Sequence, residues 1–62
     1  MVFNTGRIVV FIDGYGEHEL GIVVMQYDNY DTEVMFVGGY QALVNGEDVK
    51  EGYLIPLEEI CE

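Results

Sequence analysis

Two apolar runs joined by a polar turn decide the fold of this chain: Leu20-Gly-Ile-Val-Val-Met-Gln-Tyr27 and Glu33-Val-Met-Phe-Val37. Both runs are rich in β-branched and aromatic residues, which favour strands because they pack well on a pleated surface. Between them, Asp28-Asn-Tyr-Asp-Thr32 favours a turn, since Asp and Asn side chains accept hydrogen bonds from nearby backbone N–H groups. The sequence therefore predicts an antiparallel hairpin across a five-residue turn.

Three further segments predict strands on either side of this hairpin. Upstream lies the β-branched run Arg7-Ile-Val-Val-Phe-Ile12, which ends at the loop Asp13-Gly-Tyr-Gly16. Downstream, the pair Gly38-Gly39 ends the hairpin and a fourth strand is expected over 40–44. The dipeptide after it, Asn-Gly, readily accepts the positive φ angles of a tight turn. A fifth extended piece is expected over 53–55.

The C-terminal segment Pro56-Leu-Glu-Glu-Ile60 has two interpretations. Proline at the first position and acids near the positive end favour a helical turn, whereas the alternative is an edge strand. Elsewhere no window shows apolar residues at helical spacing over ten or more residues, as a stable helix would require. The sequence thus predicts an all-β fold, a small five-stranded barrel that spans residues 1–62 as a single domain, with either a short helical turn or an edge strand at the C-terminus.

The order of these segments resembles SH3-like small barrels, most of all their KOW and Tudor-like branches. The resemblance is carried by 6–13, by 20–25, by 33–37 and by the closing run Tyr53-Leu-Ile-Pro-Leu-Glu-Glu-Ile60. In those families a glycine followed by β-branched residues opens strand two, and Gly21-Ile-Val-Val24 is the matching piece. The resemblance implies a barrel and no catalytic residues. A polyproline groove is not expected, because the chain has no tryptophan.

Charge is the outstanding property of the composition. Twelve Asp and Glu residues against Arg7 and Lys50 give a net charge of −10. Such an excess weakens a compact state by self-repulsion, while it improves solubility and steers cationic partners. Three explanations compete: a solvated surface that keeps an apolar chain soluble, adaptation to salt, or an acidic binding surface for a basic groove. Direct binding to nucleic acid is not expected, because this surface would repel phosphate.

Little in the sequence predicts chemistry. His18 lies between Glu17 and Glu19, but consecutive residues of an extended chain point to opposite faces and do not converge. One histidine and one cysteine, Cys61, forty-three residues apart, do not make a zinc site, and the acids of 28–33 lack the calcium-loop pattern. The chain has no serine nucleophile. We therefore expect no enzyme activity, no cofactor and no metal.

The single cysteine and the N-terminal residues predict the compartment. Cys61 has no partner for an intramolecular disulfide, which fits a reducing environment. The apolar run Ile8-Val-Val-Phe-Ile12 is too short for a signal peptide or a membrane span. A cytoplasmic protein that does not enter the membrane is expected.

The remaining candidate site combines tyrosines and carboxylates in or beside two neighbouring loops. Tyrosine rings make good interface anchors, and carboxylates around them would pair with Arg or Lys of a partner. The predicted partner-binding residues are Tyr15, Glu17, Glu19, Tyr27, Asp28, Tyr30, Asp31 and Glu33. Both faces of the strands are also partly apolar, since Ile22 and Val24 alternate with Val23 and Met25, so an interface or a homodimer could form there.

Three hypotheses about function follow. The first is a non-catalytic acidic inhibitor or nucleic-acid mimic that occupies a basic groove of a nucleic-acid-binding protein. In size and charge the chain resembles small phage-encoded inhibitors and DNA mimics. The second is an assembly module that oligomerises through its apolar strand faces, with the acids as solubilising groups. The third, composite catalysis across a dimer, would depend on His18.

Overall fold

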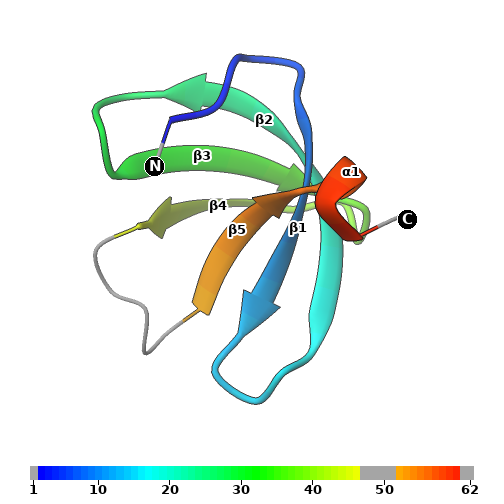
Figure 1. The fold of residues 1–62 in the computed structure, drawn as a ribbon. Coiled ribbons are helices and arrows are strands. Elements are labelled where there is room, and N and C mark those ends of the chain that lie inside the picture. The colour runs from blue at the N-terminus through cyan, green and yellow to red at the C-terminus, as the bar shows by residue number, and fades with distance from the viewer. Residues whose placement is uncertain (1, 47–51, 61–62) are drawn as a thin grey trace.

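The apolar runs form five strands of one antiparallel sheet, followed by a single helical turn (Figure 1). The structure is a computed structural model, which describes residues 2–46 and 52–60. Its elements are β1 (Ile8–Asp13), β2 (His18–Gln26), β3 (Asp31–Phe36), β4 (Gln41–Asn45), β5 (Gly52–Pro56) and α1 (Leu57–Ile60). The predicted all-β class and the five strands are confirmed, and of the two interpretations of the C-terminal segment the helical turn is the one that forms.

The sheet is curled so that its two edge strands come together. The strand order is β4-β3-β2-β1-β5, so β1 pairs with β2 on one side and with β5 on the other. β4 and β5, the two edge strands, also contact each other, and the sheet closes on itself as a small barrel (Figure 1). Closure of this kind shortens the exposed strand edges on which other chains could aggregate.

β2 is the longest strand and takes part in both halves of the barrel. It pairs with β1 along its first half and with β3 from Gly21 onward. The register against β3 shifts between Val23 and Met25, which is a β-bulge that lets the strand bend. At Gly21 a Cβ atom would lie 2.5 Å from Val34 Cγ1, so only glycine lets the two strands approach this closely.

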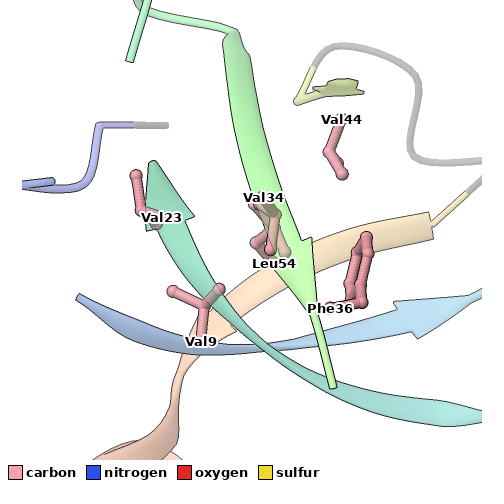
Figure 2. Packing of buried hydrophobic residues seen from close by; sticks show 6 residues of the cluster. All are labelled: Val9, Val23, Val34, Phe36, Val44 and Leu54. Atoms are coloured by element: carbon pink, nitrogen blue, oxygen red, sulfur yellow. The ribbon is translucent and has the colours of Figure 1, made fainter. Parts of the chain in front are cut away.

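The interior contains apolar side chains from every strand (Figure 2). These are Val9, Val23, Val34, Phe36, Val44 and Leu54. Thr32 is fully buried among them, and its hydroxyl donates a 2.9 Å hydrogen bond to Gln26 Oε1. The same oxygen accepts from Phe3 N at 3.0 Å, which ties the N-terminal segment to the end of β2.

The strand boundaries differ from the predicted ones in physically informative ways. His18 and Glu19 belong to β2 instead of the first loop, because they pair with Ile12 and Phe11. The turn between β2 and β3 is shorter than predicted, since Asp31 and Thr32 already pair within the sheet. The tail is helical over 57–60, so the edge-strand alternative is not what forms. The predicted free thiol of Cys61 lies outside the described residues.

Candidate functional site

The loop between β1 and β2 is organised by one carboxylate. Asp13 Oδ1 accepts hydrogen bonds from the backbone N–H groups of Tyr15 at 2.8 Å and Glu17 at 3.0 Å. This arrangement folds the loop back on itself, as Asp side chains commonly do in turns. It places the Tyr15 ring at the loop tip, where 96% of the residue is exposed. The predicted pair Tyr15 and Glu17 is thus displayed to solvent on an ordered turn.

The loop between β2 and β3 is organised in the same way at the other end of β2. Asp28 Oδ1 accepts from the backbone N–H groups of Tyr30 and Asp31, both at 2.7 Å. These hydrogen bonds, the one from Asp31 most strongly, favour the ionised carboxylate and hold the pKa of Asp28 below its ordinary value. Tyr27 and Tyr30 are both exposed in this loop. Asp28 is therefore a structural acid of the turn as well as a surface charge.

Two tyrosine hydroxyls are bound to glutamates. Tyr27 OH donates to Glu33 Oε1 at 2.9 Å, and Tyr40 OH donates to Glu19 Oε1. The hydrogen bond from each phenol to its glutamate, assisted by repulsion between carboxylate and phenolate, raises the pKa of both Tyr27 and Tyr40. The contact between Tyr40 and Glu19 joins residues twenty-one positions apart, and sequence reasoning did not find it.

These hydrogen bonds predict a selective change in tyrosine titration. Glu33→Gln is expected to lower the pKa of Tyr27 toward the ordinary value of about 10, because the charged acceptor is lost. It should leave the titration of Tyr40 as it is in the wild type. Ultraviolet absorbance of the phenolate measures this, with Tyr27→Phe identifying which part of the curve belongs to Tyr27. Glu17→Gln is the control, because it removes a loop charge that neither phenol contacts. If Glu33→Gln and Glu17→Gln lowered the pKa of Tyr27 equally, the effect would not come from the hydrogen bond between Tyr27 and Glu33.

The predicted partner-binding residues do not form one surface. Tyr15 and Glu17 lie in the loop that precedes β2, whereas Tyr27, Asp28 and Tyr30 lie in the loop that follows it. The two loops are consecutive in the sequence, but they lie at opposite ends of this nine-residue strand (Figure 1). Measured along the strand they are on the order of 25 Å apart, whereas the Debye length is about 8 Å at physiological salt. The two acidic ends therefore act independently at physiological ionic strength.

The other three predicted residues lie on strands. Asp31 and Glu33 belong to β3 and adjoin the second loop, whereas Glu19 pairs with Phe11 near the first. Glu19, together with Phe11, Phe36 and Tyr40, lines a cleft of about 180 Å³ beside β4. This cleft combines aromatic rings with a carboxylate that already holds a tyrosine hydroxyl.

The outer face of the sheet carries an exposed apolar surface. Ile8 pairs with Ile22, and Ile22 pairs with Met35, so these three side chains form a row across β1, β2 and β3. Leu20 and Val37 adjoin the row, where Val37 N donates to Leu20 O. We call these five residues the outer apolar patch; they line a shallow groove of about 320 Å³. The alternation of apolar residues predicted such a face but not which residues would occupy it.

His18 does not converge with the glutamates that flank it in the sequence. His18 is exposed and pairs with Ile12, and its strand neighbour Glu19 lies on the opposite face of β2. Within residues 2–46 and 52–60, no three His, Cys, Asp or Glu side chains gather closely enough to hold a metal ion. Over the same residues, no helix has the length and apolar character needed to cross a membrane.

Comparison of the chain with protein-family models, with curated proteins and with solved structures finds no match.

Proposed function

We propose that this chain is a non-catalytic acidic protein-binding module that occupies a basic groove of a nucleic-acid-binding protein and blocks it. One observation carries the proposal: each loop flanking β2 displays exposed tyrosine beside carboxylates, in a chain of net charge −10. Tyr15 accompanies Asp13 and Glu17 at one end. Tyrosine rings offer large contact area at little entropic cost, and carboxylates attract the Lys and Arg side chains of such a groove.

The order within the two loops supports binding. Asp13 and Asp28 each accept two backbone N–H groups, so both turns are fixed before any partner arrives. A surface that is already ordered loses less conformational freedom on association. The carboxylates would then steer a basic partner toward the loops, while the tyrosines would slow its release.

The distribution of charge supports a groove-shaped partner surface. The molecule measures 26 × 23 × 23 Å, and described carboxylates stand at both ends of β2 and on α1. Nucleic acid likewise presents negative charge repeatedly along its length. A groove lined by Lys and Arg could contact both ends of β2 at once. For this reason we propose that the acidic surface mimics nucleic acid, in preference to the alternative that the acids only keep the domain soluble.

The proposal predicts a strong salt dependence of binding. A partner captured from host lysate at low salt should lose at least about tenfold in affinity between about 50 and 200 mM salt, because ion pairs with exposed carboxylates are screened. DNA should compete with the chain for this partner. The double variant Glu17→Gln with Glu33→Gln should bind more weakly and with a shallower slope of log Kd against log salt.

A matched control is Glu59→Gln, which removes a carboxylate of α1 outside both loops. It should change the slope less than Glu17→Gln alone or Glu33→Gln alone. Isothermal titration at four salt concentrations measures these slopes. An affinity indifferent to salt, or a partner that DNA does not displace, would count against the acidic surface as the contact.

A second function, an assembly module, is favoured by the outer apolar patch. Ile8, Leu20 and Ile22 are each at least 40% exposed, and Val37 is 73% exposed. Contiguous apolar surface on a small domain commonly marks an interface. Copies of the chain joined through this face would sediment as a concentration-dependent oligomer, whereas the first function leaves the chain monomeric.

A further inference from the structure

The inner and outer faces of β1, β2 and β3 are both apolar. The inner face supplies Val9, Val23 and Val34, which are almost completely buried and form the core. The outer face supplies the outer apolar patch, which the described elements leave exposed. Single exposed apolar residues are normal on any protein, but three in register across adjacent strands form a continuous surface.

The C-terminal helical turn covers a different part of this outer face. α1 contacts β1 and β5 (Figure 1). On that side Val10, which pairs with Leu20 and with Ile55, is only 5% exposed. Leu20, on the far side of Val10, remains 41% exposed. On the outer face the fold therefore buries Val10 and leaves its cross-strand neighbour Leu20 exposed.

A carboxylate borders the open part of this surface. Glu33 lies two residues before Met35 on the same face of β3, a spacing of about 6.6 to 6.8 Å. Its carboxylate accepts hydrogen bonds from Tyr27 OH and Gln41 Nε2, which are neutral donors, so its charge is retained. Tyr27 thus holds Glu33 in place beside the patch.

Two other glutamates near the patch do not contribute to its border. Glu19 pairs with Phe11 and lines the cleft with Phe36 and Tyr40, so its side chain lies on the inner face of β2. Glu58, near Ile8, is bound to Arg7, and its charge is compensated within the chain. The negative charge at the border of the patch is therefore that of Glu33.

From this juxtaposition we infer that the outer apolar patch is the docking surface for an apolar segment of the partner that is flanked by Lys or Arg. The inference rests on the proposed function and names its contact face. Apolar side chains of the segment fill the groove over Ile22 and Met35, and a flanking cation pairs with Glu33. Interfaces commonly have this anatomy, an apolar centre with a polar rim.

Charge selects this occupant over a second copy of the chain. A symmetric dimer places the same patch against itself, so Glu33 at its edge would face a second acidic surface. Each copy also carries a net charge of −10. A basic segment removes this repulsion and replaces it with attraction. Met35, with its flexible thioether side chain, can adapt to apolar groups of different shapes.

Three synthetic peptides of equal length test the inference with the full chain. The first has an apolar centre with Lys and Arg flanks, the second has the same centre with Glu flanks, and the third has basic flanks around a Gly-Ser centre. The first peptide should bind at least about tenfold more tightly than the others, which is the gain expected from burying one or two apolar side chains. Amide chemical-shift changes should fall at Leu20, Ile22, Met35 and Val37.

Two variants at exposed residues connect the binding to the patch. Leu20→Gln should weaken the first peptide about tenfold, whereas Tyr53→Gln, at a residue of β5 that is 43% exposed and separated from β2 by β1, should not. Ile22→Thr is a second patch variant that keeps a β-branched residue in the strand. Circular dichroism establishes that each variant is folded.

The outcomes separate the two proposals. Equal binding of both basic peptides, unaffected by Leu20→Gln, would overturn the docking surface and leave the acidic binding function standing. Failure of both basic peptides to bind would remove the proposed function and the docking surface together. Sedimentation of a dimer that Leu20→Gln dissociates would overturn the inference in favour of a second copy as the occupant.

Discussion

Phe36→Ala is expected to remove most of the free energy of unfolding of this protein. Phe36 is 4% exposed and packs in the core, edge-on to Phe11 at 6.0 Å between ring centroids and against Tyr40 at 5.2 Å. Truncation of a buried phenylalanine costs about 3–5 kcal/mol. A chain of 62 residues has roughly 3–9 kcal/mol in total, at about 0.05–0.15 kcal/mol per residue. The variant should therefore be marginally stable or unfolded.

Urea unfolding followed by circular dichroism measures this effect. Val37→Ala is the control, because the next residue along the chain is 73% exposed and should change stability by less than about 0.5 kcal/mol. Similar midpoints for the two variants would mean that the Phe36 ring does not contribute to the core as its burial indicates. Loss of the Phe36 ring should also remove the wall of the cleft on which Tyr40 rests.

The strands could be predicted from the sequence because local pattern and tertiary pairing agree there. The runs around Val9, Val23 and Val34 are β-branched, bounded by Gly, Asp or Asn, and too short for helices. Their boundaries were less predictable. His18 and Glu19 have no strong strand preference, yet they extend β2 because β1 offers pairing partners opposite them.

The sequence does not predict which face of each strand is turned toward the core, because both faces are apolar. Ile22 and Val23 are chemically similar, but one is 40% exposed and the other 1%. The bulge at Val24 then resets the alternation, so that Met25 points outward and Gln26 pairs with Thr32 inside. A bulge depends on the pairing of two strands in space, and no residue type in this run predicts its position.

The candidate site shows the same limit. Residues of one loop, such as Asp28, Tyr30 and Asp31, could be grouped from the sequence because an Asp side chain bonds its own turn. The prediction that the loops before and after β2 form one site did not take account of β2 itself, which separates them by its length. The contact of Tyr40 with Glu19 requires β2 and the turn before β4 to be placed in space.

The apolar patch and the acidic charge are connected by the fold. An exposed apolar face on a small barrel invites self-association, and a carboxylate at its border opposes that pairing. Glu33 is held at this border by the hydroxyl of Tyr27. The explanation of the charge as a solubilising surface and the proposal of a binding surface are therefore compatible, because the same carboxylate would repel a second copy and attract the proposed basic segment.

Gly52→Ala is expected to disrupt the pairing of β5 with β1. Gly52 pairs with Asp13 and has φ +136°, a backbone conformation that residues with a Cβ rarely adopt. A Cβ atom would overlap the Phe11 ring and lie 2.7 Å from the carbonyl oxygen of Ile12. The backbone oxygen belongs to the β1 strand and cannot yield without breaking the sheet. Backbone strain costs about 1–3 kcal/mol, and overpacking typically adds about 1–3 kcal/mol.

Gly16→Ala separates these two contributions. Gly16 also has a positive φ, +82°, but a Cβ atom there would meet nothing within 4 Å. The free energy of unfolding of Gly16→Ala should therefore fall only by the cost of backbone strain, about 1–2 kcal/mol. That of Gly52→Ala should fall substantially more. Thermal unfolding resolves the difference, since 1 kcal/mol shifts the midpoint by about 4–8 °C in a domain of this size. Equal shifts for the two variants would mean that the ring of Phe11 and the β1 backbone can move aside. The closure of the barrel between β1 and β5 would then be looser than the close approach at Gly52 implies.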